Sequence, residues 1–342
     1  MEYILNDVLE IKNGKNQKAV ENSEGQYPIY GSGGVIGYAD DYICDADTVV
    51  IGRKGSINNP IYVSEPFWNV DTAFGLVARR EVLLPRYLFY FCKKFDFEKL
   101  NKTVTIPSLT KSDLLNIKIK LPDIDEQQLV VDKLIRIESV MEFRKQELNV
   151  LDNLIKARFV EMFGDPTTNP KGYPVKVLSE IAEYWNGLTY KPEDVSDEGI
   201  IVLRSSNIQN ATLDFADIVR VSCKIGDKKY VQDNDILMCS RNGSARLVGK
   251  VALIKDVDEA MSFGAFMMII RSAYYSYLIT YFQMPAFRMQ IATGATTTIN
   301  QITGRMLDAV KLPVPDADTI NQFANFVHQV DKSKVIKLKN ES

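Results

Sequence analysis

Residues 5–14 read LNDVLEIKNG, and residues 178–187 read LSEIAEYWNG, at an offset of 178 − 5 = 173 residues. Two further pairs of segments follow in the same order, namely GRKGS (52–56) with SRNGS (240–244) and IKLP (119–122) with VKLP (310–313). Their offsets are 240 − 52 = 188 and 313 − 122 = 191 residues. Because the offset grows steadily and the order is kept, the sequence predicts one domain fold used twice, with loop insertions in the second copy.

Length and composition agree with a duplicated globular protein. The chain has 342 residues, 46% hydrophobic and 25% charged, which is more than one hydrophobic core usually holds. Two domains of roughly 120 to 150 residues with helical connectors fit this length. A duplicated domain on a rigid spacer suits a ligand that presents two sites in fixed register, and duplex nucleic acid is the commonest such ligand.

The cysteines and the N-terminal segment favour a soluble, cytoplasmic protein. Cys44, Cys92, Cys223 and Cys239 show neither C-x-x-C pairing nor metal-ligand spacing, so we expect reduced core thiols. The N-terminal residues MEYI do not form a basic segment followed by an apolar one. No apolar run approaches the ~18 residues that span a bilayer, so we expect no membrane association.

The net charge lacks the basic excess that is typical of nucleic-acid-binding proteins. It is −3 overall, with 21 basic and 25 acidic residues in 1–165 and 20 and 19 in 166–342. An ordinary acidic protein is therefore one interpretation. The alternative is that cations gather in a few Gly- and Ser-rich loops, because phosphate contacts need only local positive charge.

A long helix is the clearest single element. Residues 123–163 contain neither Gly nor Pro, begin with an acidic first turn, and are followed by Gly164 and Pro166. Apolar residues recur every seventh position, at Leu134, Met141, Leu148, Ile155 and Met162, with Val130, Ile137 and Leu151 at the other seam position. At ~1.5 Å per residue, a helix of about 40 residues is roughly 60 Å long. The sequence therefore predicts a stiff coiled-coil strut that needs a helical partner.

A shorter helix is expected in the matching place of the second copy. After Pro313, apolar residues recur at helical spacing and give way to lysines, with Phe323 and Val330 as the expected seam residues. A helix over residues 319–340 would be about 33 Å long, so it would cover only part of the first strut. The rest of that stripe would then meet another protein, another copy of this chain, or water.

Each copy is expected to have an α+β fold. The first copy is predicted to contain strands at 48–51, 61–63, 74–78 and 117–120 and a helix at 85–100. The second is predicted to contain strands at 236–239, 250–254, 266–270 and 309–312 and a helix at 274–291.

The endings of the two copies resemble the target-recognition domains of type I restriction–modification specificity subunits. They read TIPSLTKSDLLNIKIKLP (105–122) followed by DEQQ (125–128), and TINQI (298–302) through KLP (311–313) followed by NQ (321–322). Residues 5–14, YPIYGSGG (27–34), GRKGS (52–56) and their second-copy counterparts resemble the same family. No single motif is diagnostic of this family, but the whole set of motifs, repeated on both sides of a heptad helix, is diagnostic of it.

The resemblance implies a protein without catalytic activity whose two recognition domains each read one half of a bipartite double-stranded DNA target. It implies recognition domains at 1–122 and 166–314, a connector helix at 123–165 and a short conserved helix at 315–342. The helices would pair antiparallel, space the two halves, and dock methyltransferase (modification) subunits alongside restriction subunits. No cofactor is expected on this chain, since S-adenosylmethionine would bind the methyltransferase subunits. The short C-terminal helix departs from the family pattern, so self-association through the long helix is an alternative.

The candidate DNA-binding residues lie in short loops. Arg53 and Lys54 between two glycines can approach the duplex closely, with Arg forming two hydrogen bonds to guanine or phosphate and Lys acting as a point charge. GRKGS and SRNGS pair Arg53 with Arg241. The full candidate set is Tyr30, Ser32, Arg53, Lys54, Ser56, Asn58, Lys102, Thr103 and Thr105 in the first copy, and Arg204, Ser205, Asn207, Arg241, Asn242, Ser244, Arg246, Thr296 and Thr297 in the second.

Other function classes have weaker sequence support. The segment GSGGVIG (31–37) has its third glycine one place late for a dinucleotide loop, and NPIY (59–62) lacks a proline of the adenine-methyltransferase motif. His328 is the only histidine, so catalysis by Ser-His or Cys-His pairs lacks a part. A self-contained adenine methyltransferase and a coiled-coil adaptor without nucleic-acid contact remain the alternatives.

Overall fold

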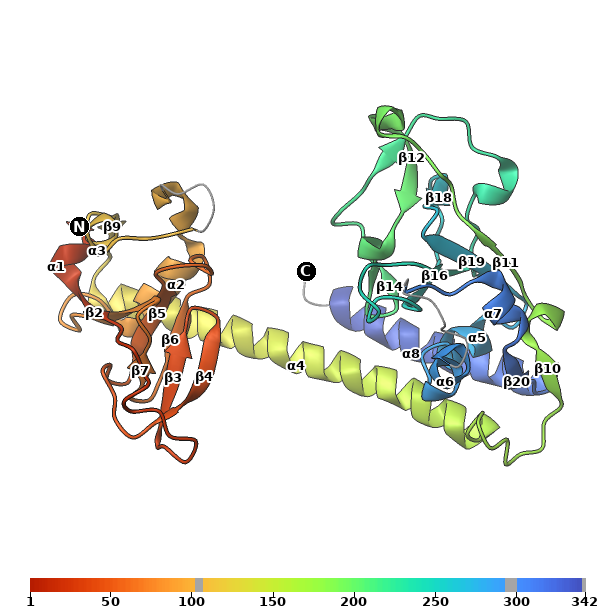
Figure 1. Ribbon diagram of the computed structural model, residues 1–342, viewed down its shortest axis with the longest axis horizontal. Helices are drawn as coiled ribbons and strands as arrows, with labels where there is room; N and C mark the ends of the chain where they lie inside the picture. Colours follow the sequence, from red (N-terminus) through yellow and green to blue (C-terminus); the bar gives the residue numbers. More distant parts are fainter. Residues whose placement is uncertain (102–106, 293–299, 340–342) are drawn as a thin grey trace. The chain divides into compact units, whose positions relative to one another are not determined.

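The computed structural model describes residues 1–101, 107–292 and 300–339, with side chains of the last helix described as far as Lys334. The chain divides into two compact units, Met1–Arg144 (unit 1) and Lys145–Ser342 (unit 2). Both units mix helices with small sheets (Figure 1), so the expected α+β class is confirmed. Among the described residues, no helix combines the length and the apolar character needed to cross a membrane.

Unit 1 is built around a four-stranded antiparallel sheet of order β2-β8-β5-β6. A three-stranded sheet, β4-β3-β7, and a pair, β1-β9, complete its strands. The elements are β1 (Glu2–Ile4), α1 (Leu5–Val8), β2 (Leu9–Asn13), β3 (Tyr27–Gly31), β4 (Gly34–Ala39), β5 (Thr48–Gly52), β6 (Ile61–Val63), β7 (Trp68–Asn69), β8 (Ala73–Ala78), α2 (Pro85–Lys94), η1 (Phe97–Leu100), α3 (Lys111–Leu115) and β9 (Lys118–Lys120). All five residues of β5 are buried, and four are β-branched, which favours a central strand.

Unit 2 repeats this plan with a four-stranded sheet of order β11-β19-β16-β17 and a three-stranded sheet of order β15-β12-β18. Its elements are β10 (Val175–Val177), η2 (Leu178–Glu180), β11 (Glu183–Asn186), η3 (Pro192–Asp194), β12 (Val195–Leu203), η4 (Ser205–Asn207), β13 (Ile208–Gln209), β14 (Thr212–Leu213), β15 (Arg220–Val221), η5 (Asp227–Lys229), β16 (Ile236–Cys239), β17 (Val251–Leu253), β18 (Met261–Phe263), β19 (Met267–Arg271), α5 (Tyr275–Tyr281), α6 (Pro285–Ala292), α7 (Gly304–Asp308), β20 (Lys311–Pro313) and α8 (Ala317–Lys339). The second copy therefore carries extra short strands, as the growing offset predicts.

Strand register gives the offset between the two units. Asn13 pairs with Phe74 in unit 1 and Asn186 pairs with Met268 in unit 2, which sets offsets of 186 − 13 = 173 and 268 − 74 = 194. The expected equivalence of IKLP with VKLP is wrong by two residues. Leu5 N donates to Ile117 O and Leu178 N donates to Val310 O, so the offset there is 310 − 117 = 193. The offset therefore falls by one near the end, rather than growing throughout.

The closing glycine of the repeated segment has a steric reason. A Cβ atom on Gly14 would collide with the carbonyl oxygen of Val70, and one on Gly187 would collide with that of Phe263. In both units this glycine directly follows the edge strand, β2 or β11. Its N–H donates to the first residue of the adjacent strand, Ala73 O of β8 or Met267 O of β19. The glycine of the repeated Asn-Gly is therefore required by close backbone packing.

Two predicted helices end earlier than expected. The helix expected at 85–100 stops at Lys94, because Phe95 is extended and Asp96 caps the separate turn η1. The helix expected at 274–291 is divided into α5 and α6, because Pro285 has no backbone N–H to continue the first helix.

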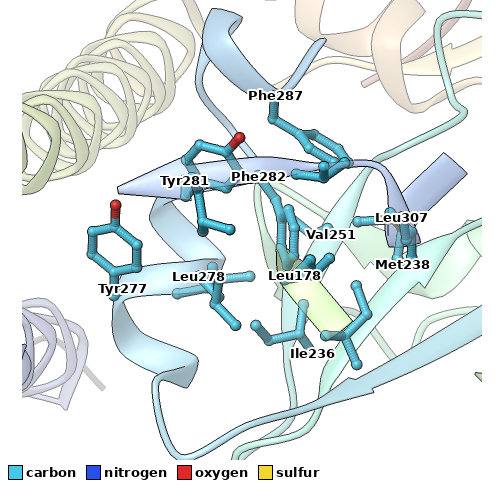
Figure 2. Packing of buried hydrophobic residues seen from close by; sticks show 14 of the residues in the cluster. Leu178, Ile236, Met238, Val251, Tyr277, Leu278, Tyr281, Phe282, Phe287 and Leu307 are labelled. Atoms are coloured by element: carbon cyan, nitrogen blue, oxygen red, sulfur yellow. The ribbon is translucent and has the colours of Figure 1, made fainter. Parts of the chain in front are cut away.

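Helix α4 (Ile124–Phe163) confirms the predicted 40-residue helix, and its last part belongs to the core of unit 2. There, Phe159 and Phe163 are buried against Tyr277 of α5 and Phe323 of α8, with ring centroids 4.8 to 5.6 Å apart. In Figure 1, α8 lies beside this end of α4. Figure 2 shows Leu178, Ile236, Tyr281 and neighbouring residues in the same core.

The expected seam residues have different environments along the helices. Ile155 and Met162 pack against the unit 2 core, and Phe323 and Val330 of α8 are buried. Leu134 lines a groove of about 540 Å³ beside α2, and Leu148 is half-buried. Met141, in contrast, is 66% exposed. The seam is therefore covered by this chain mainly at the end of α4 that belongs to unit 2.

Gln127 ties the start of α4 to unit 1 and gives a first testable expectation. Its buried amide accepts from Leu84 N (2.9 Å) and donates to the carbonyl oxygens of Val82 (2.9 Å) and Pro122 (3.1 Å). We expect Gln127→Ala to lower the free energy of unfolding of unit 1 by about 2 to 3 kcal/mol, since three backbone groups lose their partner. Denaturant unfolding followed by Trp68 fluorescence measures this. The exposed neighbour Gln128→Ala is the control, and an equal effect in both variants would contradict the assignment.

Candidate nucleic-acid interface

The cationic loop of unit 1 follows β5 and is held on both sides by backbone hydrogen bonds. Arg53 N and Lys54 N donate to Thr72 O at 2.7 and 3.3 Å. On the other side, Gly55 N donates to Pro107 O (3.1 Å), and Leu109 N donates to Arg53 O (2.9 Å). The loop therefore lies between the segment before β8 and the segment before α3, as a short continuation of the sheet.

Unit 2 repeats the same set of hydrogen bonds after β16. Ser240 N and Arg241 N donate to Phe266 O at 2.9 and 3.1 Å, Asn242 N donates to Asn300 O (3.3 Å), and Ile302 N donates to Ser240 O (2.7 Å). Isolated bridges agree with this register, pairing Lys54 with Ser108 and Arg241 with Gln301. Both units thus build one framework around a cation-bearing loop.

This register corrects the expected pairing of the two loops by one residue. Arg241 corresponds to Lys54 rather than to Arg53, and Arg53 corresponds to Ser240. Ser240 is only 4% exposed, whereas the Arg53 guanidinium lies 5.8 Å from the ring centre of Phe74 and 3.5 Å from the Asp71 carbonyl oxygen. The letter match of GRKGS with SRNGS pairs Arg with Arg and Ser with Ser. The residues that make equivalent backbone hydrogen bonds lie one position away from this alignment.

The structure brings the predicted serine loops next to the cationic loops. In unit 1, a Cβ on Gly52 would lie 2.9 Å from the Ser32 Cβ, and one on Gly55 would lie 3.9 Å from the Ser32 Oγ. In unit 2, Asn242 Nδ2 donates to Ser205 Oγ at 3.2 Å. Ser32 and Ser205 are themselves equivalent, since Val70 N donates to Tyr30 O and Gly264 N donates to Leu203 O.

Three candidates have structural roles. Asn207 is 1% exposed, accepts from Arg204 N and donates to the carbonyl oxygens of Asp214 and Asp217, so the expectation that it contacts DNA is wrong. Arg204 pairs with the Asp217 carboxylate at 2.7 Å. Asn58 uses both ends of its amide to hold the start of η1, accepting from Phe97 N and donating to Asp96. Sequence alone could not reveal these partners, because the folded loop decides which carbonyl, carboxylate or N–H group meets each side chain.

Tyr30 is half-buried beside Phe67, with ring centroids 5.3 Å apart in an edge-on arrangement. Burial, followed by the charge of Glu65, raises the pKa of the Tyr30 phenol, so the hydroxyl stays protonated and can donate or accept a hydrogen bond. Tyr30 therefore borders the Ser32 loop mainly as a packing residue.

The remaining described candidates are accessible. Lys54, Ser56, Ser244 and Arg246 are exposed. Lys102, Thr103, Thr105, Thr296 and Thr297 lie outside the described residues. Among the described residues, no group of His, Cys, Asp and Glu side chains could hold a metal ion. The accessible chemistry is therefore that of cations, hydroxyls and amides on a rigid backbone, which suits hydrogen bonding to phosphates and base edges.

Comparison with known protein families gives this duplicated framework its context. A family model described as the type I restriction modification DNA specificity domain matches residues 1–153. Residues 1–153 of this chain are therefore similar to this specificity domain. The match covers unit 1 and continues into α4. Unit 2, which lies almost entirely outside the matched residues, repeats the sheet orders of unit 1.

Similar proteins carry the same family name. The EcoKI specificity subunit of Escherichia coli K12 is 28% identical over 155 residues, which are 43% of this chain and 33% of that protein. The match therefore spans about a third of the length of that relative. The MjaVIII specificity subunit of Methanocaldococcus jannaschii is 22% identical over 324 residues, covering 87% of this chain and 72% of that protein. The S subunit structure from M. genitalium shares the fold, with a TM-score of 0.60 at 15% identity over 99% of this chain and 91% of that one.

Phe266 is a residue of this interface that the sequence analysis did not select. It was expected to begin a strand, but it precedes β19 and is 60% exposed. Its carbonyl oxygen holds the Arg241 loop, and its ring lies 5.3 Å from the Arg241 guanidinium carbon. Its position directly after Gly264-Ala265 was the available signal that the chain is still turning there.

Proposed function

We propose that this chain is a non-catalytic specificity subunit of a type I restriction–modification complex, in which each unit reads one half of a bipartite double-stranded DNA target. The observation that carries the proposal is the framework of backbone hydrogen bonds, built twice, that presents Lys54 in unit 1 and Arg241 in unit 2 at equivalent positions. A rigid backbone with accessible cations and hydrogen-bonding side chains is what groove and phosphate recognition require.

The proposed partners are the modification and restriction subunits, with S-adenosylmethionine bound by the modification subunit. Support comes from the family match and from a solved structure titled for assembly of the type I system, which shares the fold with a TM-score of 0.52. Exposed apolar residues of α4 offer a docking surface, since Val140, Met141 and Phe143 are 49 to 69% exposed. Mapping adenine methylation after coexpression with modification subunits tests this, and a bipartite motif is expected.

Salt dependence of DNA binding tests the proposed role of Lys54. If Lys54 contacts a phosphate, Lys54→Ala should make the plot of log binding constant against log salt concentration less steep by about 1. Fluorescence anisotropy with a duplex between about 50 and 200 mM salt measures this slope. Lys118→Ala, an exposed lysine of β9, is the matched control and should leave the slope unchanged. Equal slopes for the wild type and Lys54→Ala would contradict the role.

Equilibrium dialysis with S-adenosylmethionine separates this proposal from a self-contained methyltransferase. The isolated chain should not bind the cofactor, while the complex with a modification subunit should. Binding by the isolated chain would overturn the assignment of a non-catalytic role.

A further inference from the structure

Phe266 and Arg241 form an exposed aromatic–guanidinium pair in unit 2. The Phe266 ring is 60% exposed, and its centre lies 5.3 Å from Cζ of Arg241, within the range of a cation–π contact. The Phe266 carbonyl also accepts from Arg241 N at 3.1 Å, so backbone and side chain of the two residues are held together. Phe266 belongs to none of the hydrophobic clusters of unit 2, so its ring is free to serve a contact outside the core.

Arg241 differs in its charge environment from three other arginines of unit 2. Arg204, Arg220 and Arg271 of unit 2 each lie within 2.8 Å of a carboxylate oxygen. No carboxylate among the residues that the structure describes forms such a pair with Arg241. Its guanidinium is therefore held by a ring face, and its N–H donors stay available to a ligand.

Side-chain bonds also restrain the loop that carries Arg241. Asn242 Nδ2 donates to Ser205 Oγ (3.2 Å), Asn242 Oδ1 accepts from Ser244 N (3.0 Å), and Asn300 Nδ2 donates to Gly243 O (3.2 Å). These contacts fix the backbone after Arg241, and the backbone hydrogen bonds of Ser240 to Phe266 and Ile302 fix the backbone before it. Little conformational entropy therefore remains to be lost there on binding.

The equivalent pair in unit 1 is Lys54 and Thr72. Thr72 O accepts from Lys54 N as Phe266 O accepts from Arg241 N, but Thr72 offers no aromatic face. Lysine is a point charge on a flexible stem, whereas arginine has a planar fork of donors that matches two acceptors at once. The same backbone framework therefore carries a lysine without an aromatic neighbour in unit 1 and an arginine beside a phenylalanine ring in unit 2.

We propose that Phe266 is a positioning residue that orients the Arg241 guanidinium for a two-bond contact with O6 and N7 of a guanine in the half-site read by unit 2. The inference rests on the proposed function and adds a base identity to it. Guanine is the base that presents two acceptors at the spacing of the guanidinium donors in the major groove. In unit 1 the equivalent Lys54 makes a phosphate contact, so this position carries no guanine requirement in the other half-site.

Base discrimination by single variants tests the positioning role. The wild type should lose about 10- to 100-fold in affinity when the guanine is replaced by another base, and part of that when 7-deazaguanine removes the N7 acceptor. Phe266→Leu should reduce this discrimination several-fold, Phe266→Tyr should retain it, and Arg241→Lys should abolish the response to 7-deazaguanine. If Phe266→Leu weakens binding equally on all duplexes, Phe266 has only a structural role and the inference is overturned.

A transplant into unit 1 is the complementary test. Lys54→Arg combined with Thr72→Phe should create a guanine preference in the half-site read by unit 1, larger than that of Lys54→Arg alone. An equal preference in both variants, with thermal unfolding showing that both are folded, would refute the role of the ring. Failure of the inference is distinguishable from failure of the proposed function, because a wild type that selects no bipartite duplex refutes the latter, whereas a bipartite target without a guanine sensitive to Arg241 refutes only the former.

Discussion

Phe159→Ala is expected to lower the free energy of unfolding of unit 2 by about 3 to 5 kcal/mol, the largest stability effect that we anticipate for one substitution. Phe159 is fully buried, and its ring lies 4.8, 5.0 and 5.6 Å from those of Phe163, Tyr277 and Phe323. Removing it leaves a cavity between α4, α5 and α8 that three large rings cannot readily refill.

Fluorescence can follow the two units separately, because the chain has two tryptophans, Trp68 in unit 1 and Trp185 in unit 2. Denaturant unfolding in a Trp68→Phe background should show the loss for Phe159→Ala in the Trp185 signal. The adjacent control, Val160→Ala, removes a side chain that is 45% exposed and should change stability by less than about 1 kcal/mol. Similar losses for both variants would show that α4 does not contribute to the unit 2 core as described.

Replacing both framework cations should nearly abolish specific DNA binding. Lys54→Ala is expected to weaken binding to the cognate duplex about 10-fold and Arg241→Ala about 10- to 100-fold, on the scale of one phosphate and one base contact. The two residues lie in different units and share no partner, so their free-energy effects should add, giving a loss of about 100- to 1000-fold in the double variant. Anisotropy titrations of cognate and scrambled duplexes measure both effects.

The control for this double variant is Lys118→Ala with Arg136→Ala, which removes the same charge from exposed positions outside the framework. It should retain nearly all specific affinity. If the control loses as much as the framework variant, binding depends on total charge and the framework has no special role. Arg241→Ala should also reduce binding to scrambled duplexes much less than binding to cognate ones, since a base contact is sequence-dependent.

The sequence was most informative where periodicity and steric rules act over short distances. The heptad pattern and the terminating Gly164 predicted α4 within a residue, and the buried β-branched run in β5 was placed correctly. The repeated Asn-Gly pointed to a duplicated fold because the glycine is required by backbone packing in both units. These features depend on residues that are close in sequence, or on steric limits of the backbone that apply to every protein.

The candidate site was harder to predict because its details depend on tertiary hydrogen bonds, which no local sequence pattern specifies. Asn207 looked like a loop amide, but Asp214 and Asp217 satisfy it in the interior. The equivalence of Lys54 with Arg241 follows from hydrogen bonds to Thr72 and Phe266, and letter matching alone favoured the neighbouring residue. Phe266 was expected to begin a strand, since apolar character does not reveal where a turn ends and a strand begins.

Selection of binding sites from a random duplex pool, with the full chain as the binder, tests the central claim most directly. Two homologous units that each read DNA should enrich two short conserved blocks separated by a spacer of constant length and variable sequence. Substitutions at Lys54 and Arg241 should each alter binding through a different block. A single contiguous block, or no enrichment at any position, would contradict the account.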